Sequence, residues 1–270
     1  MIQDLRISLI QTSLHWEDKA ANLKMLQNKI AGISEKSAII ILPEMFSTGF
    51  SMNNELLAET MEGETIQWMK KTAASKSAIL TGSLIVKEQD AGELYYYNRL
   101  IWMLPTGSMG IYDKRHLFAF GKEDRHYTPG EKRLIASVSG WKINLQVCYD
   151  LRFPVWQRQS TGAGTQIPEY DLLIFVANWP AVRSNAWKVL LQARAIENQC
   201  YVIGVNCTGT DGNGLEYAGE SMIIGPLGEI IKIMGSEEEI FTYLLDRNKL
   251  DQTRLKFPFL RDADSFHIQP

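Results

Sequence analysis

Residues of three catalytic types stand where a folded sheet would bring them together. Glu44, Cys148 and Asn178 each follow an apolar, strand-like run, at residues 39–43, 143–147 and 172–177. In layered α/β proteins, ligands bind in the crevice outside the carboxyl ends of the strands. Lys114 lies in a polar stretch between an apolar run and an aromatic loop. We therefore expect these four residues to converge on one site.

The combination of side chains matters more than any single one. A lone buried cysteine is usually a small hydrophobe, and a lysine beside other charges is usually solvated. Amide hydrolysis through a covalent step needs a nucleophile, a base that takes and returns a proton, and a donor for the negative carbonyl oxygen. Cys148, Glu44 and Lys114 can supply these three parts.

The elements that must position these residues alternate along the chain. Apolar strand-like runs occur at residues 5–10, 38–42, 78–86, 100–104, 141–147, 172–177, 201–206, 222–224 and 240–245. Helical periodicity appears at residues 22–33 and 184–198, where Ser184 is the expected N-cap. The pattern predicts a layered α/β sheet protein with a hairpin over residues 222–231 around Pro226 and Gly228.

The predicted domain organisation is a single unit over residues 1–270, because no repeat or flexible linker divides the chain. Its last segment, residues 255–270, contains Phe257, Phe259, Leu260 and Phe266. That much aromatic surface is unusual for a solvated tail. We expect the segment to pack on the core or on a second subunit.

Composition excludes several classes of protein. The 270 residues are 45% hydrophobic and 22% charged, which excludes disorder, and the net charge of −3 comes without any basic cluster that would indicate nucleic acid or an anionic membrane. The apolar runs are too short to span a bilayer, and no signal peptide is recognised. Three cysteines without C-x-x-C spacing suggest free thiols in the cytoplasm. A small-molecule partner is expected, without metal or cofactor, and His116 and His126 are interpreted as hydrogen-bonding residues.

Four blocks of sequence together resemble the nitrilase (carbon–nitrogen hydrolase) superfamily, and within it most closely the omega-amidase branch. The blocks are Pro-Glu-Met-Phe at 43–46, Lys-Arg-His-Leu-Phe at 114–118, Cys-Tyr-Asp-Leu-Arg-Phe-Pro at 148–154, and Asn-Trp-Pro at 178–180 followed by Ala-Arg-Ala-Ile-Glu-Asn at 193–198. The resemblance runs from about Ile7 to Leu245. It implies a four-layer αββα sandwich whose subunits pair into an eight-layer homodimer.

The resemblance also implies roles for individual residues. Cys148 matches the nucleophile, Glu44 the general base, and Lys114 the cation that helps hold the oxyanion. Glu123 stands where the family often has a second acidic residue, although its flanking sequence departs from the usual pattern. From the residues themselves, a helix beginning near Pro154 would leave the backbone N–H of Tyr149 free to donate to the oxyanion. A neighbouring ammonium would lower the pKa of the thiol.

Substrate contacts are inferred from position in the sequence. Asn178 and Trp179 could line a pocket, and Phe46 and Phe118 could form its apolar wall or simply pack in the core. Three arginines, Arg115, Arg152 and Arg183, lie near the site in sequence. Arg115 is expected to point away, and Arg152 to pair with Asp150 or another carboxylate. Arg183 has no acidic neighbour in sequence, so it is our choice for binding a substrate carboxylate.

The leading interpretation is a cysteine-dependent amidase that hydrolyses a small 2-oxo dicarboxylate monoamide, such as 2-oxoglutaramate or 2-oxosuccinamate, through a thioester. Hydrolysis of an N-carbamoyl compound or a nitrile would use the same triad. A non-catalytic small-molecule or partner-binding protein on the same fold is the alternative from another class. The set of Glu44, Lys114 and Cys148 argues against it, because a binding module has no need of all three.

Overall fold

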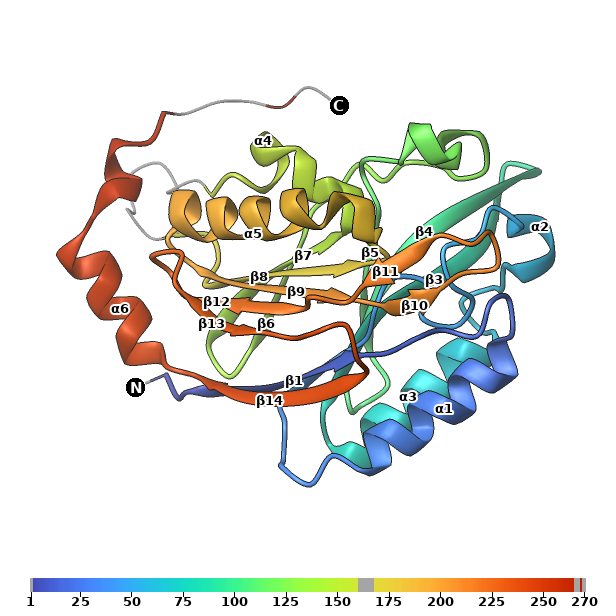
Figure 1. Cartoon of the computed structure of the whole chain (residues 1–270), viewed down its shortest axis with the longest axis horizontal. Coiled ribbons are helices and arrows are strands. Elements are labelled where there is room, and N and C mark those ends of the chain that lie inside the picture. Colours follow the sequence, from blue (N-terminus) through green and yellow to red (C-terminus); the bar gives the residue numbers. More distant parts are fainter. Residues whose placement is uncertain (1, 160–167, 265–267, 269–270) are drawn as a thin grey trace.

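Two six-stranded sheets form the centre of the computed structural model, which describes residues 2–159, 168–264 and 268 (Figure 1). The first sheet has the order β14-β1-β2-β3-β4-β5, and β1, β2 and β3 are parallel. Its strands are β1 (Leu5–Gln11), β2 (Ile39–Ile41), β3 (Ile79–Asp90), β4 (Glu93–Met103), β5 (Met109–Asp113) and β14 (Glu239–Leu245).

The second sheet has the order β13-β12-β9-β8-β7-β6, with β7, β8 and β9 parallel. Its strands are β6 (Leu134–Val138), β7 (Trp141–Val147), β8 (Leu172–Ala177), β9 (Tyr201–Asn206), β12 (Met222–Ile224) and β13 (Ile230–Ile233). A separate two-stranded ribbon pairs β10 (Thr208–Thr210) with β11 (Glu216–Ala218). The predicted hairpin is the β12–β13 pair, which turns through Gly228 at a φ of 86°.

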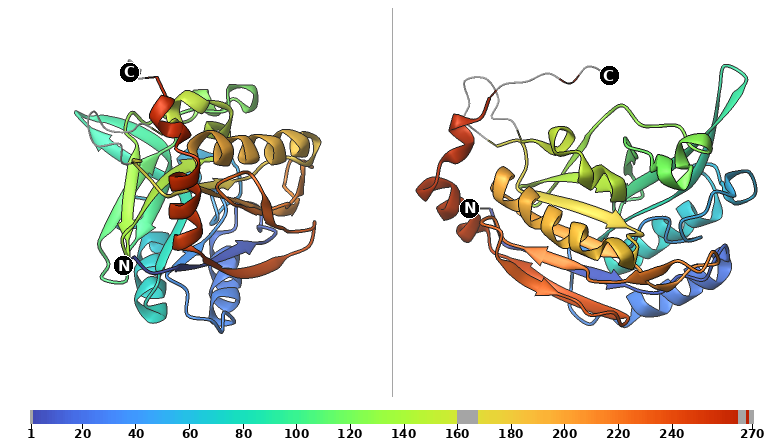
Figure 2. Two further views of the ribbon diagram at one scale, coloured as in Figure 1. Left: turned by 90° about the vertical axis from the view of Figure 1, so that its left-hand side faces the viewer. Right: turned by 45° about the horizontal axis from the view of Figure 1, so that its top comes forward.

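Helices cover the outer faces of both sheets and complete a four-layer αββα sandwich, as expected (Figures 1 and 2). α1 and α3 cover the first sheet and α5 covers the second, while α6 lies at the edge near the N-terminal end of β1. The α-helices are α1 (Lys19–Ala31), α2 (Asn54–Leu57), α3 (Glu64–Lys76), α4 (Pro154–Gln157), α5 (Ser184–Asn198) and α6 (Arg247–Lys256). Short 3₁₀ turns are η1 (Ala119–Gly121), η2 (Glu123–Arg125), η3 (Cys148–Arg152), η4 (Ala181–Arg183) and η5 (Phe259–Asp262).

Strand β2 explains why several strands are continuously apolar rather than alternating. Ile39 and Ile41 pack in the core between the two sheets, whereas Ile40 packs in the cluster that includes Leu26 of α1 and Ile66 of α3. Successive side chains of a strand point to opposite faces, so a strand covered on both faces needs apolar residues at every position. In the described part of the chain, no helix has the length and apolar character needed to span a membrane.

Most predicted elements are confirmed, with differences at their ends. β7, β8, β9, β12 and α5 have the predicted bounds, but Ser184 is the first residue of α5 and the N-cap position belongs to Arg183, without a side-chain cap. Within the C-terminal segment, Leu260 is buried while Phe259 is 60% exposed. Phe266 lies outside the described residues.

Candidate active site

The predicted residues come together just beyond the carboxyl ends of the strands that they follow. Cys148 follows β7 directly and begins η3, Asn178 follows β8, and Lys114 follows β5. Glu44 lies three residues beyond the end of β2. All four side chains are buried. The prediction that these residues converge is therefore confirmed by their placement and by the contacts described next.

A buried ion cluster joins two carboxylates to one ammonium. Lys114 Nζ lies 2.9 Å from Glu44 Oε1, 3.0 Å from Glu123 Oε1 and 2.8 Å from Glu123 Oε2. None of these side chains is exposed. Burial, followed by the charge of Glu44, raises the pKa of Glu123, whereas burial lowers that of Lys114 but the two carboxylates raise it above its ordinary value overall. Glu123 thus joins the other three residues, as the resemblance implied.

The thiol of Cys148 lies beside the carboxylate of Glu44. Burial and the hydrogen bond and charge of Glu44 raise the pKa of Cys148 well above its ordinary value, and Lys114 offsets this only in part. The expectation of a lowered thiol pKa is therefore wrong, because burial outweighs the ammonium. Glu44 Oε2 also accepts the backbone N–H of Asn178 at 2.8 Å. A carboxylate held against a neutral thiol can take its proton when the sulfur attacks a substrate.

Unusual backbone conformations coincide with the site. Cys148 has a φ of 44°, Met45 next to Glu44 has 42°, and Lys122 before Glu123 has 62°. Non-glycine residues in this left-handed region cost about 1–3 kcal/mol each and persist where the surrounding structure holds them. The first N–H groups of η3, including that of Tyr149, have no acceptor within the turn because 3₁₀ bonds reach three residues back. The turn therefore presents a thiol side chain together with backbone donors that have no acceptor within η3.

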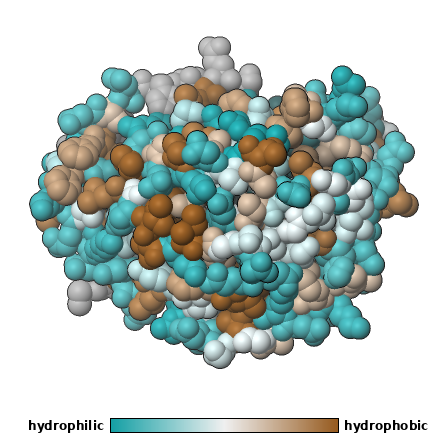
Figure 3. Space-filling model, viewed as in Figure 1, coloured by the Kyte–Doolittle hydropathy of each residue, from teal (hydrophilic) through white to brown (hydrophobic). Residues whose placement is uncertain are grey.

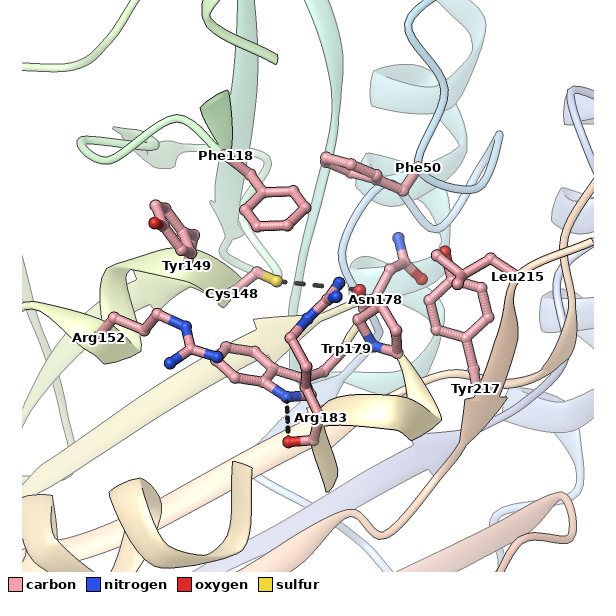
Figure 4. A pocket seen from close by; sticks show the side chains of 11 residues that line it. Phe50, Phe118, Cys148, Tyr149, Arg152, Asn178, Trp179, Arg183, Leu215 and Tyr217 are labelled. Atoms are coloured by element: carbon pink, nitrogen blue, oxygen red, sulfur yellow. Dashed lines mark hydrogen bonds between the residues drawn. The ribbon is translucent and has the colours of Figure 1, made fainter. Parts of the chain in front are cut away.

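The thiol opens into a small pocket of about 40 Å³ (Figure 4). Its wall consists mostly of aromatic and other apolar side chains with a few polar groups, from residues Phe50, Phe118, Cys148, Tyr149, Arg152, Asn178, Trp179, Pro180, Arg183, Leu215 and Tyr217. A larger chamber of about 440 Å³ shares Phe50, Phe118, Arg183 and Leu215 with this pocket. An apolar cavity with a few convergent polar groups suits a small organic ligand.

Five of the six predicted substrate-binding residues line the pocket, namely Phe118, Tyr149, Asn178, Trp179 and Arg183. Phe46 does not. Its side chain is fully buried in the core beneath the first sheet, where its ring packs 5.9 Å from that of Trp68 and against Gly82. The residue after a left-handed Met45 turns back into the core, so Phe46 supports the Glu44 turn rather than the cavity wall.

Two guanidinium groups reach the pocket, each above an aromatic ring (Figure 4). Arg152 lies 5.0 Å above the ring of Trp179, and Arg183 lies 5.2 Å above that of Phe118. Within the described residues neither arginine forms a salt bridge. The expected pairing of Arg152 with Asp150 is wrong, because hydrogen bonds from other residues already occupy that carboxylate.

The third arginine and the two histidines lie elsewhere. Arg115 donates to the Gly130 carbonyl and does not line the pocket, as expected. The Nδ1 atom of His116 is 2.8 Å from Asp150 Oδ1, and that of His126 is 3.1 Å from Asn54 Oδ1. Both histidines therefore form hydrogen bonds, as interpreted from the sequence.

Sequence reasoning missed several members of the site. Asn98 contacts the ion cluster, and Arg152, Phe50, Leu215 and Tyr217 line the pocket. The last three come from loops or a short strand far from the other motifs, and no local pattern marks them. Arg152 had a usable signal, because it lies four residues after Cys148 in the same turn.

One known protein family matches most of the chain. The family described as carbon-nitrogen hydrolase matches residues 6–255, and the chain belongs to this family. It is therefore a hydrolase that acts on carbon–nitrogen bonds.

Individual relatives also align with nearly the whole chain. An omega-amidase of Escherichia coli K12, YafV, is 41% identical over 98% of both chains. A 2-oxoglutaramate amidase of Bacillus subtilis is 33% identical over 95% of this chain and 96% of its own. The crystal structure of XC1258 from Xanthomonas campestris, a CN-hydrolase superfamily protein with an arsenic adduct in its active site, is 43% identical. It superimposes with a TM-score of 0.93 over 98% of this chain and 99% of that one.

Proposed function

We propose that this protein is an amidase that hydrolyses the terminal amide of a small 2-oxo dicarboxylate monoamide, such as 2-oxoglutaramate or 2-oxosuccinamate, releasing ammonia and the diacid. The observation that carries the proposal is the buried cluster of Glu44, Lys114 and Glu123 beside the thiol of Cys148. The names of the omega-amidase and 2-oxoglutaramate amidase relatives support this choice of substrate.

The reaction proceeds through two chemical stages. Glu44 takes the proton of Cys148 as the sulfur attacks the amide carbon, and Lys114 with the backbone N–H of Tyr149 stabilises the negative oxygen. Glu44 then gives the proton to the leaving nitrogen, ammonia departs, and a thioester remains on Cys148. Glu44 next takes a proton from water, which attacks the thioester carbon. The carbon–sulfur bond breaks, the diacid leaves, and the proton returns to the thiol.

Arg183 supplies the contact for the substrate's distal carboxylate. A guanidinium grips a carboxylate through two parallel hydrogen bonds, and this one is held above Phe118 and forms no salt bridge with any described residue. Arg152 adds a second positive charge to the same pocket. Together they favour an anionic substrate over a neutral amide of the same length.

N-carbamoyl compounds and nitriles remain alternative substrates, because their hydrolysis would use the same Cys148, Glu44 and Lys114. The experiment that decides among them is an ammonia-release screen over 2-oxo monoamides, simple amides, carbamoyl amino acids and nitriles. Iodoacetamide treatment beforehand provides the control for a cysteine-dependent reaction. Fastest turnover of 2-oxo monoamides, lost after alkylation, supports the proposal. No turnover of any compound would favour the non-catalytic binding protein instead.

We further propose that residues 1–270 act as one unit and form a homodimer in the cytoplasm. Exposed apolar side chains support pairing, including Val189 and Ile196 of α5. Figure 3 shows several apolar patches on one face of the molecule. Leu255 and Phe259 near the C-terminus are also exposed. The three free cysteines are typical of a reducing compartment. Light scattering at micromolar concentration tests the pairing, and a clean monomer would contradict it.

A further inference from the structure

Asn98 connects the two carboxylates of the ion cluster. It lies within β4 and its side chain is buried. Its Nδ2 atom donates to Glu44 Oε1 at 2.8 Å and to Glu123 Oε1 at 3.1 Å. A carboxamide nitrogen has two hydrogens, so each carboxylate receives one of them. The two acidic residues are thereby held by a single side chain.

The backbone of the same residue reaches the third member of the cluster. The Asn98 carbonyl accepts the backbone N–H of Lys114 at 3.0 Å. This contact continues the β4–β5 ladder, in which Arg99 faces Asp113 and forms a salt bridge with it. Asn98 therefore contacts Glu44 and Glu123 through its side chain and Lys114 through its main chain.

The charges of Glu44, Glu123 and Lys114 explain why a side chain that donates to both carboxylates is needed. Two carboxylates share one ammonium, and burial together with the charge of Glu44 raises the pKa of Glu123. An ammonium has three hydrogens, and Lys114 directs its contacts to three carboxylate oxygens. The Asn98 amide adds two further donors. The opposite orientation of that amide would place its carbonyl oxygen against both carboxylates.

The two oxygens of Glu44 have separate environments. Oε1 accepts from Lys114 and Asn98, whereas Oε2 accepts the backbone N–H of Asn178, and the Cys148 thiol lies beside the same carboxylate. Fixing Oε1 from two directions prevents the carboxylate from rotating away from the sulfur. Misplacement of a catalytic group by about 1 Å can cost about 100-fold in rate.

We propose that Asn98 is a positioning residue, which holds the carboxylate of Glu44 beside Cys148 by donating one hydrogen bond to each carboxylate of the cluster. The inference rests on the proposed function, since it assigns Glu44 the role of base. Asn98 does not line the pocket, so its effect is on the chemical step and not on substrate binding.

The test replaces Asn98 by leucine, which is of similar size but cannot donate. We expect Asn98→Leu to lower kcat by about 10- to 100-fold, with KM changed less than about threefold. The acidic limb of the pH profile of kcat/KM should move up by about one pH unit, because the ionised carboxylates lose a donor. Asn98→Asp, nearly the same shape, adds a third carboxylate and should shift the limb further in the same direction.

Asn144→Leu is the matched control. Asn144 is also buried in a strand, β7, and its side chain bonds to Gln146 rather than to the cluster. This variant should keep the parent pH profile. A purely structural role for Asn98 predicts loss of folded protein in thermal unfolding without movement of the acidic limb, and that result in both Asn98 variants would overturn the proposal.

A substrate-independent readout separates this proposal from the proposed function. The rate at which iodoacetamide alkylates Cys148 should show the same upward shift of its acidic limb in the Asn98 variants. If the parent fails to turn over amides but the alkylation profile shifts, the substrate assignment fails and the role of Asn98 stands. An unchanged alkylation profile in both variants removes Asn98 from the positioning role whatever the substrate.

Discussion

Oδ1 of Asp150 lies 2.8 Å from the ring Nδ1 of His116 and accepts the backbone N–H of His116 at 2.9 Å. Asp150 lies in η3, the turn that begins at Cys148, and His116 lies two residues after Lys114. Oδ2 of the same carboxylate accepts from Tyr112 and from the backbone of Val147. One buried side chain thus fixes the thiol-bearing turn relative to the loop that follows the lysine.

Replacing Asp150 should therefore lower the stability of the protein. Asp150→Asn keeps the shape but places an amide N–H₂ against groups that donate, so we expect a loss of about 1–3 kcal/mol in the free energy of unfolding. Urea unfolding measures it, with Asp90→Asn at the exposed end of β3 as the control. Equal stability of both variants would show that the four hydrogen bonds contribute nothing net.

Only one of the three cysteines should be required for turnover. Cys148→Ala removes the acyl-enzyme route and should abolish ammonia release while leaving the fold. Cys200 and Cys207 are also buried but do not line the pocket around the thiol of Cys148. Their alanine variants should stay within about twofold of the parent in kcat. Residual activity of Cys148→Ala within tenfold of the parent rejects the nucleophile assignment.

Replacement of Glu44 and replacement of Glu123 should have different effects on kcat and on stability. Glu44→Gln removes the base and should lower kcat by about 10²- to 10⁴-fold. Glu123 accepts from Lys114, Asn98 and the backbone of Phe118, so glutamine would turn an N–H₂ toward donors. We expect Glu123→Gln to lose less in kcat but about 1–3 kcal/mol in unfolding free energy. Comparable losses of kcat would mean that the carboxylates share the proton transfer.

Substrate charge should be recognised by the pocket arginines. Arg183→Met should raise KM for 2-oxoglutaramate tenfold or more, because hydrogen bonds to charged groups contribute about 1.5–3 kcal/mol. A neutral short-chain amide should be barely affected. Arg152→Met is the companion variant, and the larger change in KM identifies the arginine closer to the carboxylate. If charged and neutral amides suffer equally, Arg183 does not bind the substrate's carboxylate.

The resting enzyme should hold a thiol and not a thiolate. Burial and Glu44 raise the pKa of Cys148, so the neutral form persists through neutral pH and the charge appears only in alkaline solution. The difference in ultraviolet thiolate absorbance between the parent and Cys148→Ala should therefore be absent at about pH 7. A thiolate signal there would mean that Lys114 outweighs burial.

Patterns that depend on neighbouring residues could be predicted, whereas roles that depend on strand register could not. The alternating pattern of β7 and the largely continuous apolar runs of β8 and β9 gave correct bounds, and Glu44, Cys148 and Asn178 followed from the strand ends. α6 was missed because only Leu250 and Thr253 of its ten residues are buried. α3 was also missed, although its buried residues Ile66, Met69 and Ala73 keep helical spacing.

The polar residues show the same difference between roles that the sequence could predict and roles that depend on the fold. Nothing near Asn98 in sequence marks it, because its importance comes from lying across the β4–β5 ladder from Lys114. Arg152 was misassigned because Asp150 is close in sequence, but that carboxylate is already occupied by Tyr112 and His116. Proximity along the chain does not determine which donor forms a hydrogen bond to a buried acceptor.

The excess negative charge of the ion cluster bears on how the product leaves. With both carboxylates ionised, Glu44 and Glu123 carry one charge more than Lys114, and this cluster lies beside the thiol of Cys148. In the proposed reaction, the uncharged amide of the substrate becomes a carboxylate beside these groups. The repulsion that results weakens binding of the diacid and favours its departure from the site. Added product should accordingly inhibit only at concentrations well above the KM of the substrate, and tight product inhibition would contradict this.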